Sequence, residues 1–458
     1  MNWRKPLICG LLSLSGSNIL SHLKQIKTYE FSTRAVINNR RQEKLHQVLL
    51  HAYHHVPYYH RILSDNGVVV EGRVCLEKFS NLPILTKDII RQEGSALYSR
   101  DHQQRKCYLN TSGGSTGEPV TIVQDKHYDE WNIATKLYFN EMLGKEIGDA
   151  EIKLWGSVRD ILAGSTSLKD RVINHLYNRK LVNCYHLGEK ELYELIDLNN
   201  RFKPVAYWSY MEAALELARF LALKPRKFYA PRFIISTGGP LSEEVKTQIE
   251  AHVGCRVFDQ YGSREVGGIA CQCLQQQGLH TFPWWNLIEI IDENERPVEN
   301  GTGRILVTTF ENYSMPLIRY EIGDVATAGG YTCDCGRASF QLNRILGRTI
   351  GYFQKADGSR AHSHFIVQAM YYKDWIKRFQ IIQDAIDHLL IRIECSENRE
   401  MSTPDLDDIT TKTRILMGKQ CAVDFEFVES IKRSWSGKFM YTICKIDNGH
   451  SCGKSYEE

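Results

Sequence analysis

Apolar residues recur at helical spacing through much of the first 143 residues. Residues 40–64 and 127–143 read as helices, the first of them interrupted near Pro57, and Thr86 is a candidate N-cap for another helix. Residues 119–123 alternate like a strand, directly after a loop rich in Gly, Ser and Thr. This part of the chain therefore mixes helices with strand.

From residue 205 to residue 270 the pattern switches repeatedly between helix and strand. Helical spacing covers residues 212–223 and 242–252, and short apolar runs at 233–236 and 257–261 read as strands. Ser242 is a candidate N-cap, and the acidic Glu243 and Glu244 that follow it favour a helix N-terminus. Strands that alternate with helices predict an α/β sheet.

Strand-like runs separated by turns dominate residues 286–345, which predicts a β-rich subdomain. After about residue 347 the texture changes to strand patterns around a helix near 405–417, which predicts a compact α+β unit. We therefore expect an α/β fold with a large N-terminal domain at 1–346, holding mixed α/β sheets and the β-rich subdomain. A small α+β C-terminal domain is expected at 347–458.

Composition narrows the class of protein. The chain has 458 residues, of which 43% are hydrophobic and 24% charged, as in globular proteins of two or three domains. A net charge of +3 is too near balance for a nucleic-acid-binding surface. The thirteen cysteines show no regular disulfide-like spacing, so we expect them to be mostly reduced, in a cytoplasmic protein.

The apolar run at residues 7–14 follows Arg4 and Lys5 and superficially resembles a signal peptide. No small-x-small cleavage site follows it, and no segment has the ~20 apolar residues that a membrane helix needs. We therefore expect a helix or a weakly ordered leader here, and no integral membrane segment.

The loop at residues 111–118 is the most informative stretch. Its glycines let the backbone approach a ligand closely, and successive amide N–H groups in such a loop form an anion-binding nest. Hydroxyl groups add donors for phosphate oxygens. The alternative is a flexible surface loop. The predicted phosphate contacts are Thr111, Ser112, Gly113, Gly114, Ser115, Thr116 and Gly117.

Two other motifs can be compared with this loop. A P-loop needs lysine after its last glycine, whereas Gly117 is followed by Glu118. Residues 113–117 fit the G-x-S-x-G nucleophile elbow of hydrolases, with Ser115 as the nucleophile. That elbow turns from strand into helix, and here the following residues continue as strand, so covalent catalysis by Ser115 is disfavoured.

Several motifs, in order along most of the chain, resemble the adenylate-forming superfamily of acyl-CoA synthetases, and most closely its phenylacetate–CoA ligase and CapK-type branch. The lead-in HAYHHVPYYHRIL and LPILTKDII is similar to that of the branch. The motifs that carry the resemblance are TSGGSTGEPV at 111–120, TGGP at 237–240, DQYGSRE at 259–265, RYEIGD at 319–324, ILGR at 345–348 and SGKF at 436–439.

The resemblance implies a role for each motif in binding ATP. Gly238, Gly239 and Pro240 would lie along the adenine, Tyr261 would stack on it, and Asp324 would accept the ribose hydroxyls. Read alone, the first segment is equally an ordinary strand-to-helix turn, and a Gly-Asp pair equally a β-turn.

Phosphate chemistry falls to the remaining motif residues. Gly262 and Ser263 would meet the α-phosphate, Glu265 would hold Mg²⁺ beside the phosphates, and Thr116 in the loop would act in catalysis. Lys438 would bridge the attacking carboxylate and the α-phosphate, where negative charge grows in the transition state.

The resemblance places an interdomain hinge after Arg348, whose guanidinium suits a phosphate or ribose contact. Here the sequence departs from the pattern, because Thr349-Ile350-Gly351 replaces the usual acidic residues. The hinge residue is therefore not identified, although Gly351 supplies flexibility.

A Cys₃His set is a candidate structural zinc site. Cys273, His280, Cys333 and Cys335 suit tetrahedral zinc, and some members of the branch carry a similar arrangement. Cys271 competes with Cys273, which we prefer because its spacing to His280 matches the branch better. The alternative is four ordinary reduced cysteine and histidine side chains.

The resemblance implies an enzyme that uses ATP and Mg²⁺ to convert a carboxylic acid to an acyl-adenylate and then transfers the acyl group to CoA. The CapK-type branch implies a role in surface or capsular polysaccharide biosynthesis. Alternatives are direct transfer to a sugar amine or hydroxyl or to a carrier protein, and a non-catalytic nucleotide-binding relic. The acid is not identified: aromatic residues near the helices are either an acid pocket or core, namely Trp155, Tyr185, Tyr207, Trp208 and Tyr210.

Overall fold

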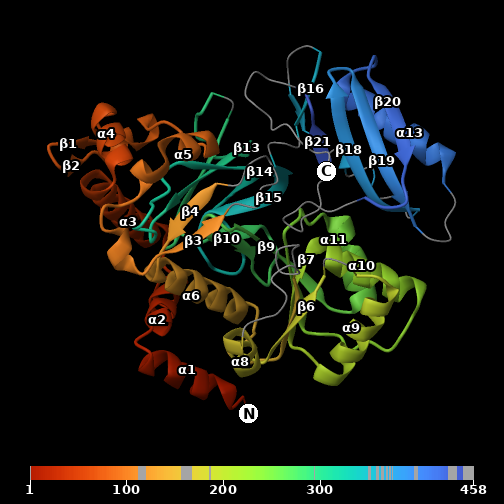
Figure 1. Cartoon of the computed structure of the whole chain (residues 1–458), viewed down its shortest axis with the longest axis horizontal. Helices are drawn as coiled ribbons and strands as arrows, with labels where there is room; N and C mark the ends of the chain where they lie inside the picture. Colours follow the sequence, from red (N-terminus) through yellow and green to blue (C-terminus); the bar gives the residue numbers. More distant parts are fainter. Residues whose placement is uncertain are drawn as a thin grey trace.

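Most of the chain is built around one eleven-stranded sheet, with the strand order β12-β13-β14-β15-β11-β10-β9-β8-β7-β5-β6 (Figure 1). The structure is a computed structural model. It describes residues 2–111, 120–155, 168–184, 187–292, 294–348, 352–356, 360–362, 366–367, 370, 373, 375–396, 401–431 and 441–446.

The parallel part of the sheet follows the predicted alternation of strand and helix. Neighbouring strands β5 to β9 pair in parallel, and β7 and β8 are buried along their whole length, as apolar runs covered on both faces should be. The strands are β5 (Glu151–Trp155), β6 (Arg179–Asn183), β7 (Ala206–Tyr210), β8 (Phe233–Thr237) and β9 (Arg256–Ser263). The helices are α8 (Leu168–Leu176), α9 (Glu189–Phe202), α10 (Met211–Leu223) and α11 (Glu243–Val253).

The predicted start of α11 is confirmed at the level of its cap. The Ser242 hydroxyl oxygen accepts the backbone N–H of Val245 at 3.2 Å, and Glu243 and Glu244 lie in the first turn. Gly254 closes the helix in the left-handed conformation, with φ +78°.

The strands from residue 267 to residue 348 continue the same sheet in antiparallel order. They are β10 (Gly267–Gln272), β11 (Leu279–Thr281), β12 (Asn286–Ile291), β13 (Gly301–Thr309), β14 (Tyr320–Gly330) and β15 (Gln341–Arg348). The expected β-rich subdomain is therefore not a separate sheet, because β15 pairs with β11, and β11 and β10 connect it to β9.

Helices gather at one end of the antiparallel strands (Figure 1). They are α1 (Arg4–Leu14), α2 (Ile19–Thr28), α3 (Arg34–His55), α4 (Pro57–Asp65), α5 (Lys87–Glu93), α6 (Lys126–Met142) and the 3₁₀ turns η1 (Leu76–Asn81), η2 (Gly94–Leu97) and η3 (His102–Arg105). Two hairpins accompany them, β1 (Val69–Val70) with β2 (Arg73–Val74) and β3 (Tyr108–Thr111) with β4 (Thr121–Gln124).

Two sequence-based expectations for these helices can be checked directly. The predicted helix at 40–64 is two helices, because Val56 is extended before Pro57, and Pro57 opens α4, where its missing N–H has no partner to lose. Thr86 caps α5 as expected, its hydroxyl oxygen accepting the N–H of Ile89 at 3.3 Å.

The C-terminal part forms its own four-stranded sheet, with the order β20-β19-β18-β21, and lies beside α10 and α11 (Figure 1). Its elements are β16 (Tyr352–Gln354), β17 (Arg360–His362), β18 (Ile376–Ala385), β19 (His388–Cys395), α13 (Thr403–Met417), β20 (Ala422–Phe427) and β21 (Thr442–Cys444). Arg219 of α10 donates to the Lys377 carbonyl oxygen at 3.1 Å, and Glu216 lies 3.3 Å from Arg378. The domain boundary at 346/347 stays a prediction.

No single helix among the described residues is long and apolar enough to cross a membrane. The helices α1 and α2 pass the same hydropathy test only as a pair, which is bent by 110°.

Candidate active site

The predicted phosphate loop connects two strands that pair with each other. Strands β3 and β4 pair antiparallel, with Thr111 opposite Thr121, so the segment between them is a hairpin connection. A hydrolase nucleophile elbow instead joins a strand to a helix, and this topology therefore argues against Ser115 as a covalent nucleophile. Residues 112–119 lie outside the described residues, so of the loop's predicted contacts the structure places Thr111 alone.

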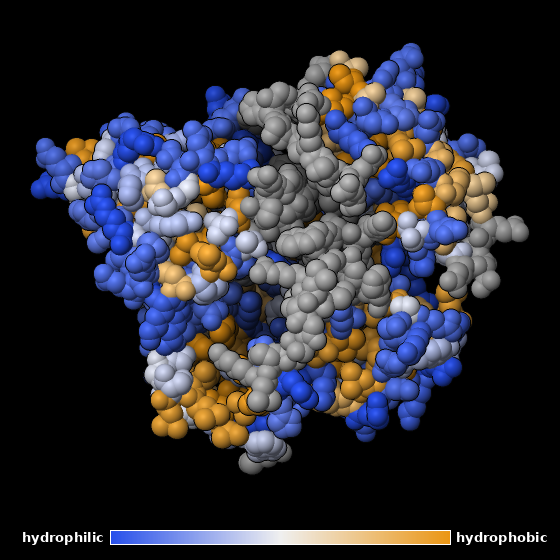
Figure 2. Space-filling model, viewed as in Figure 1, coloured by the Kyte–Doolittle hydropathy of each residue, from blue (hydrophilic) through white to orange (hydrophobic). Residues whose placement is uncertain are grey.

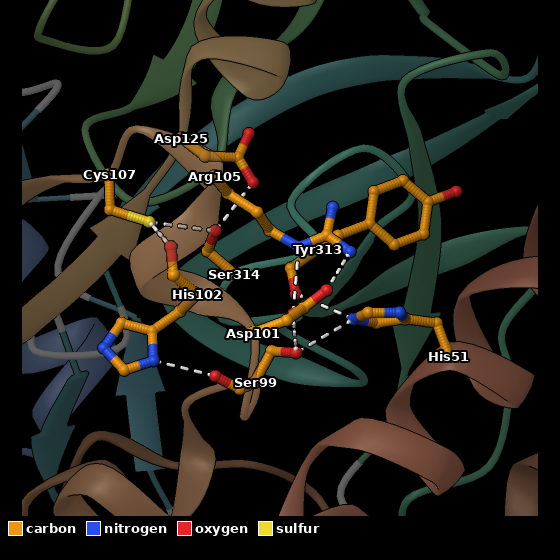
Figure 3. A network of polar contacts seen from close by, with 9 residues as sticks. All are labelled: His51, Ser99, Asp101, His102, Arg105, Cys107, Asp125, Tyr313 and Ser314. Carbon is orange, nitrogen blue, oxygen red and sulfur yellow. Dashed lines mark hydrogen bonds and ion pairs between the residues drawn. The ribbon is translucent and has the colours of Figure 1, made fainter.

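A buried polar network fastens both ends of this hairpin (Figure 3). Cys107 lies just before β3 and Asp125 just after β4. The Cys107 thiol lies 3.1 Å from the Ser314 hydroxyl oxygen, and the Ser314 hydroxyl donates to Asp125 Oδ2 at 2.7 Å. Asp125 also caps α6, because its Oδ1 accepts the N–H of Tyr128 at 2.8 Å. Ser314 therefore bridges the two ends of the hairpin.

The same network extends to η3 through Arg105 and Asp101 and to α3 through His51 (Figure 3). Arg105 makes a two-point contact with Asp101, at 3.0 and 2.6 Å, and this hydrogen-bonded pair holds the pKa of Asp101 well below its ordinary value. His51 of α3 has Nε2 2.9 Å from the Tyr313 carbonyl oxygen, and burial lowers its pKa. The carboxylate is thus charged and the imidazole neutral around neutral pH.

Side chains of the hairpin also contact the segment that carries the predicted magnesium ligand. Asn110 donates to the Arg264 carbonyl oxygen at 3.1 Å. Gln124 donates to the same oxygen at 3.0 Å and to the Glu265 carbonyl oxygen at 3.1 Å. The two strands that flank the phosphate loop are therefore bonded to the backbone at Arg264 and Glu265.

Glu265 sits in a turn whose backbone is fixed on both sides. Glu265 as a whole is 5% exposed. Its N–H donates to the Ser263 hydroxyl oxygen at 3.2 Å, and its carbonyl oxygen also accepts from the Tyr128 hydroxyl at 3.5 Å. Ser263 thus stabilises the turn, while its predicted α-phosphate contact stays a prediction.

Tyr261 and Asp324 meet, although they are 63 residues apart in the sequence. The Tyr261 hydroxyl donates to Asp324 Oδ2 at 2.7 Å, which joins the end of β9 to β14. Next to Tyr261, a Cβ at Gly262 would lie 2.5 Å from the Gly267 carbonyl oxygen, so the close approach of β9 and β10 requires glycine. The structure thus brings together the predicted adenine-stacking ring and the predicted ribose carboxylate.

Gly238 follows β8 at the same edge of the sheet, because β8 and β9 run parallel. Its φ is +85°, and a Cβ there would lie 2.7 Å from Cδ1 of Tyr210, so this turn requires glycine. Tyr210 stacks on Trp155, with ring centroids 4.3 Å apart. The predicted adenine segment at 238–240 therefore begins against an aromatic pair at the ends of β5 and β7.

Asp259, two residues before Tyr261, is the acid of this edge whose pKa is most clearly raised. Burial raises its pKa from the ordinary 3.8 to about 7. Its backbone N–H donates to the Gln272 side chain on β10 at 2.8 Å. The sequence motif identified Tyr261 as a candidate, but nothing in it indicates the raised pKa of Asp259.

The candidate acid-pocket aromatics separate into two groups. Tyr207 and Trp208 are buried in the core, the first donating to Asn199 at 2.9 Å and the second to Asn140 at 3.1 Å. For these two, the interpretation as core residues holds. Tyr210 is also buried in a core cluster, with Trp155 packed against it, and its ring lies beside Gly238. Tyr185 lies outside the described residues.

The structure places two arginines of the predicted motifs, Arg348 and Arg319. Arg348 is the last residue of β15, and its Cα is paired with that of Asp324, so the two motifs share a register. Arg319 is buried and donates to the Ser80 carbonyl oxygen at 2.7 Å, which makes it a fold residue. Thr349, Ile350, Gly351 and Lys438 lie outside the described residues.

The four predicted zinc ligands form a cluster whose ligand atoms all lie within 4.8 Å of one another. Cys273 Sγ is 3.6 Å from Cys333 Sγ, and Cys335 Sγ is 3.3 Å from His280 Nε2. Burial lowers the pKa of His280 to about 4, and its Nδ1 lies 2.9 Å from the Ser339 hydroxyl oxygen. Cys271 is buried in the core beside the cluster and is not part of it.

These distances fit a tetrahedral metal. With Zn–S near 2.3 Å and Zn–N near 2.0 Å, neighbouring sulfur atoms lie about 3.8 Å apart and sulfur and nitrogen about 3.5 Å apart. The Ser339 contact on Nδ1 leaves Nε2 to face the sulfur atoms, which is the outer support that metal-binding histidines usually have. The donor set and its spacing therefore suit a closed structural site.

The residues that hold the hairpin could not be identified from the sequence. Asn110, Gln124, Asp125 and Ser314 carry no motif, because serine and amide side chains are common at turns and helix ends. The N-cap position of Asp125, directly before the predicted helix at 127–143, was the one local signal that could have identified any of them.

Comparison with known proteins agrees with this arrangement. The CapK C-terminal domain family matches residues 353–445. The protein CapK of Staphylococcus aureus is 22% identical over 395 residues, 85% of either chain. Phenylacetate–coenzyme A ligase of Thermus thermophilus is 24% identical over 321 residues, 67% of this chain and 69% of that one.

A solved structure shares the fold over nearly the whole length. The crystal structure of 2-hydroxyisobutyryl-CoA ligase in the postadenylation state, with 2-HIB-AMP, has a TM-score of 0.72 at 20% identity over 92% of each chain. The open conformation of that enzyme with 2-HIB-AMP and CoA scores 0.60, over 91% of this chain and 93% of that one. These matches confirm the predicted fold. The C-terminal part of the chain thus matches the CapK C-terminal domain family, and most of its length is similar to CapK and to phenylacetate–CoA ligases.

Proposed function

We propose that this protein activates a carboxylic acid with ATP to form an acyl-adenylate and then transfers the acyl group to CoA. The observation that carries the proposal is the convergence of four separate motifs on one edge of the sheet. The hairpin of the phosphate loop is bonded to Arg264 and Glu265, and Tyr261 at the end of β9 is bonded to Asp324. A nucleotide spanning this edge would have its base and ribose near Tyr261 and its phosphates near the loop.

The residues divide the work of the first step. Asp324, held by Tyr261, would accept the ribose hydroxyls, and the hairpin would present the amides and hydroxyls of residues 111–117 to the phosphates. In the predicted role of Lys438, its ammonium offsets the charge that develops as the substrate carboxylate displaces pyrophosphate. Glu265 would hold Mg²⁺, because a buried carboxylate fixed beside a phosphate loop is the hard oxygen donor that this ion prefers. Bound there, the ion would supply charge stabilisation on the phosphates.

The Cys/His cluster would hold a zinc ion in a structural role. Its ligands come from the β10–β11 connection, from β11 and from the turn at 333–335. Two hydrogen bonds between Gln277 and Asp334, at 2.7 and 2.9 Å, also join the turn to this connection. Zinc would pin this turn to the sheet behind β9, which supports the strand that carries Tyr261. No catalytic step involves this ion.

The decisive experiment measures pyrophosphate release with ATP and a panel of aliphatic, hydroxylated and aromatic acids. Glu265→Gln and Lys438→Ala are each expected to reduce release by about 10²–10³-fold, as loss of one preorganised electrostatic group does. The matched controls are Glu243→Gln and Lys419→Ala, exposed residues of the same types, which should leave the rate unchanged. Unchanged release by the Glu265 and Lys438 variants would refute the assignment.

The acceptor is tested by adding CoA to the same assay. Formation of an acyl-CoA product, with release stimulated by CoA, is expected. One observation favours a second candidate, direct transfer to a sugar amine or hydroxyl or to a carrier protein in surface polysaccharide biosynthesis: the C-terminal part matches the CapK family. Release without any CoA-dependent product would support that candidate. ATP binding without release for any acid would instead favour a non-catalytic relic.

A further inference from the structure

Helix α1 is apolar around its whole circumference but buried on one side. After Lys5 it has no charged residue through Leu14. A helix that is hydrophobic all round is normally enclosed all round. In this structure Ile8 is fully buried, whereas Leu7 and Leu11 are each 44% exposed and Leu14 is 87% exposed. The composition of α1 therefore calls for a second apolar surface on its outer side.

The exposed side chains lie on one stripe, which we call the α1 stripe: Trp3, Leu7, Leu11 and Leu14. Their spacing of four, four and three residues places them on a single face of the helix. Ile8 and Leu12 point to the other side, into the core cluster shared with α2 and α6. Figure 2 shows apolar surface gathered over α1 at the lower left of the molecule. Trp3 is itself 58% exposed.

Charge near the α1 stripe identifies what would cover it. Residues 2–29 contain four Lys or Arg side chains and no Asp or Glu. Arg4 lies over the Trp3 ring, 4.5 Å from its centroid, and Lys24 is exposed. Lys5 and Lys27 lie on acids of the main body, Glu146 and Glu141. Lys5 and Lys27 are thus neutralised, and Arg4 and Lys24 remain beside the exposed leucine and tryptophan side chains to meet the headgroups of an anionic membrane.

The geometry excludes a spanning role for these residues. Eleven helical residues are roughly 16 Å long, about half the thickness of a bilayer core. Helix α2 does not extend α1, because it bends away by 110° and buries Ile19, Leu23 and Ile26 in the protein. A second copy of the chain is the alternative occupant of this face, and the experiment below distinguishes it from a membrane.

We propose that the α1 stripe is a membrane-surface anchor, with Trp3, Leu7, Leu11 and Leu14 inserted among the lipids of an anionic bilayer and the basic side chains at the headgroups. The anchor would hold the enzyme on the membrane without crossing it. This inference does not depend on the proposed function, because it concerns a surface distant from the nucleotide motifs.

Vesicle flotation tests the anchor with the full-length chain. It should float with vesicles of equal parts phosphatidylcholine and phosphatidylglycerol, bind phosphatidylcholine alone less, and detach as salt is raised. Leu7→Gln/Leu11→Gln should lower binding about tenfold or more and change Tm little, because both residues are already 44% exposed. The matched control is Leu223→Gln/Ile415→Gln, which removes two leucine-sized side chains that are 64% and 71% exposed elsewhere, and should bind like wild type.

Three results would overturn the proposal. They are no flotation of the wild-type chain with either vesicle, equal flotation of the Leu7/Leu11 variant, and equal losses in both double variants. Self-association of the wild-type chain in the absence of vesicles, abolished by Leu7→Gln/Leu11→Gln, would assign the α1 stripe to a second copy of the chain instead.

Discussion

The nucleotide edge and the Cys/His cluster flank the same part of the sheet, but they are held together by different means. At the nucleotide edge, side chains from distant segments pair with one another: Tyr261 with Asp324, and Ser314 with Asp125. In the cluster, four ligand atoms converge within 4.8 Å; His280 has a hydrogen-bond partner outside the group in Ser339, and Cys335 has one in Arg337.

The difference teaches what each site needs in order to exist. A site that binds and releases a nucleotide in every cycle must keep its shape when empty, so its buried polar groups are satisfied by the protein. Three sulfur atoms and an imidazole nitrogen gain little from each other, and a permanent ion would supply the interaction that holds them together. The folded structure of the first region should therefore be insensitive to chelators, and that of the second sensitive.

The largest effect is expected from removing two cluster ligands. Cys333→Ser/Cys335→Ser should lose about one zinc ion per chain and lower Tm by on the order of 10 °C, because the turn at 333–335 would lose its metal bonds to the sheet and keep hydrogen bonds such as those of Asp334 with Gln277. Metal content by elemental analysis and Tm by scanning calorimetry check this.

Cys271→Ser is the matched control for the cluster. It changes a buried cysteine on the adjoining strand that is outside the cluster, so it should keep the metal. Loss of zinc from Cys271→Ser, or a metal-free wild-type protein of full stability, would contradict the assignment of the ligands.

The next largest effect should come from Asp125, which helps to hold the β3–β4 hairpin at the nucleotide edge. Asp125→Ala removes the cap of α6 and the acceptor of the Ser314 hydroxyl, at a combined cost of about 2–3 kcal/mol of unfolding free energy. It should also raise the KM for ATP, since the base of the phosphate loop loosens. Urea unfolding and steady-state kinetics measure the two effects.

Ser242→Ala separates capping from positioning. It removes a cap at α11, which is worth about 1 kcal/mol, and should leave the KM for ATP unchanged. Equal changes in KM for the Asp125 and Ser242 variants would show that the Asp125 network acts on stability alone.

The two regions were not equally visible in the sequence. The cluster could be proposed from residue types, because cysteine and histidine in close pairs have few other shared uses, and the structure brings Cys273, His280, Cys333 and Cys335 together. The contact between Ser314 and Asp125 that holds the hairpin could not be proposed from the sequence, because both are ordinary polar residues and they lie 189 positions apart. Nothing local in either segment indicates the other.

The fold shows the same division. Periodicity predicted β8, β9, α10 and α11 with small errors at their ends, and the cap at Ser242 with none. It could not predict which strands pair. The joining of β15 to β11, which makes one sheet of the two predicted regions, is set by long-range contacts such as Leu279 opposite Leu342.

Strand β9 lies between the two regions, and its residue Asp259 should make the stability of the folded protein depend on pH. Its folded pKa is about 7 and its ordinary pKa 3.8, so the folded state binds the proton more tightly and stability falls as pH rises between these values. Asp259→Asn removes the buried charge. At pH 8 it should be more stable than wild type by about 1–2 kcal/mol, since partial exposure offsets some of the burial, and at pH 5 the gain should shrink. A gain that is equal at both pH values would place its origin outside this titration.

The smallest effect is expected from the contact that completes the nucleotide edge. Tyr261→Phe keeps the ring for stacking and removes the hydrogen bond to Asp324, which should cost about 1 kcal/mol and raise the KM for ATP about fivefold. Tyr207→Phe is the matched control, because its hydroxyl donates to Asn199 in the core at a similar distance, 2.9 Å. Both variants should lose similar stability, and a rise in KM is expected for Tyr261→Phe alone. If both raise KM equally, the Tyr261–Asp324 contact supports the fold and does not position the ribose carboxylate.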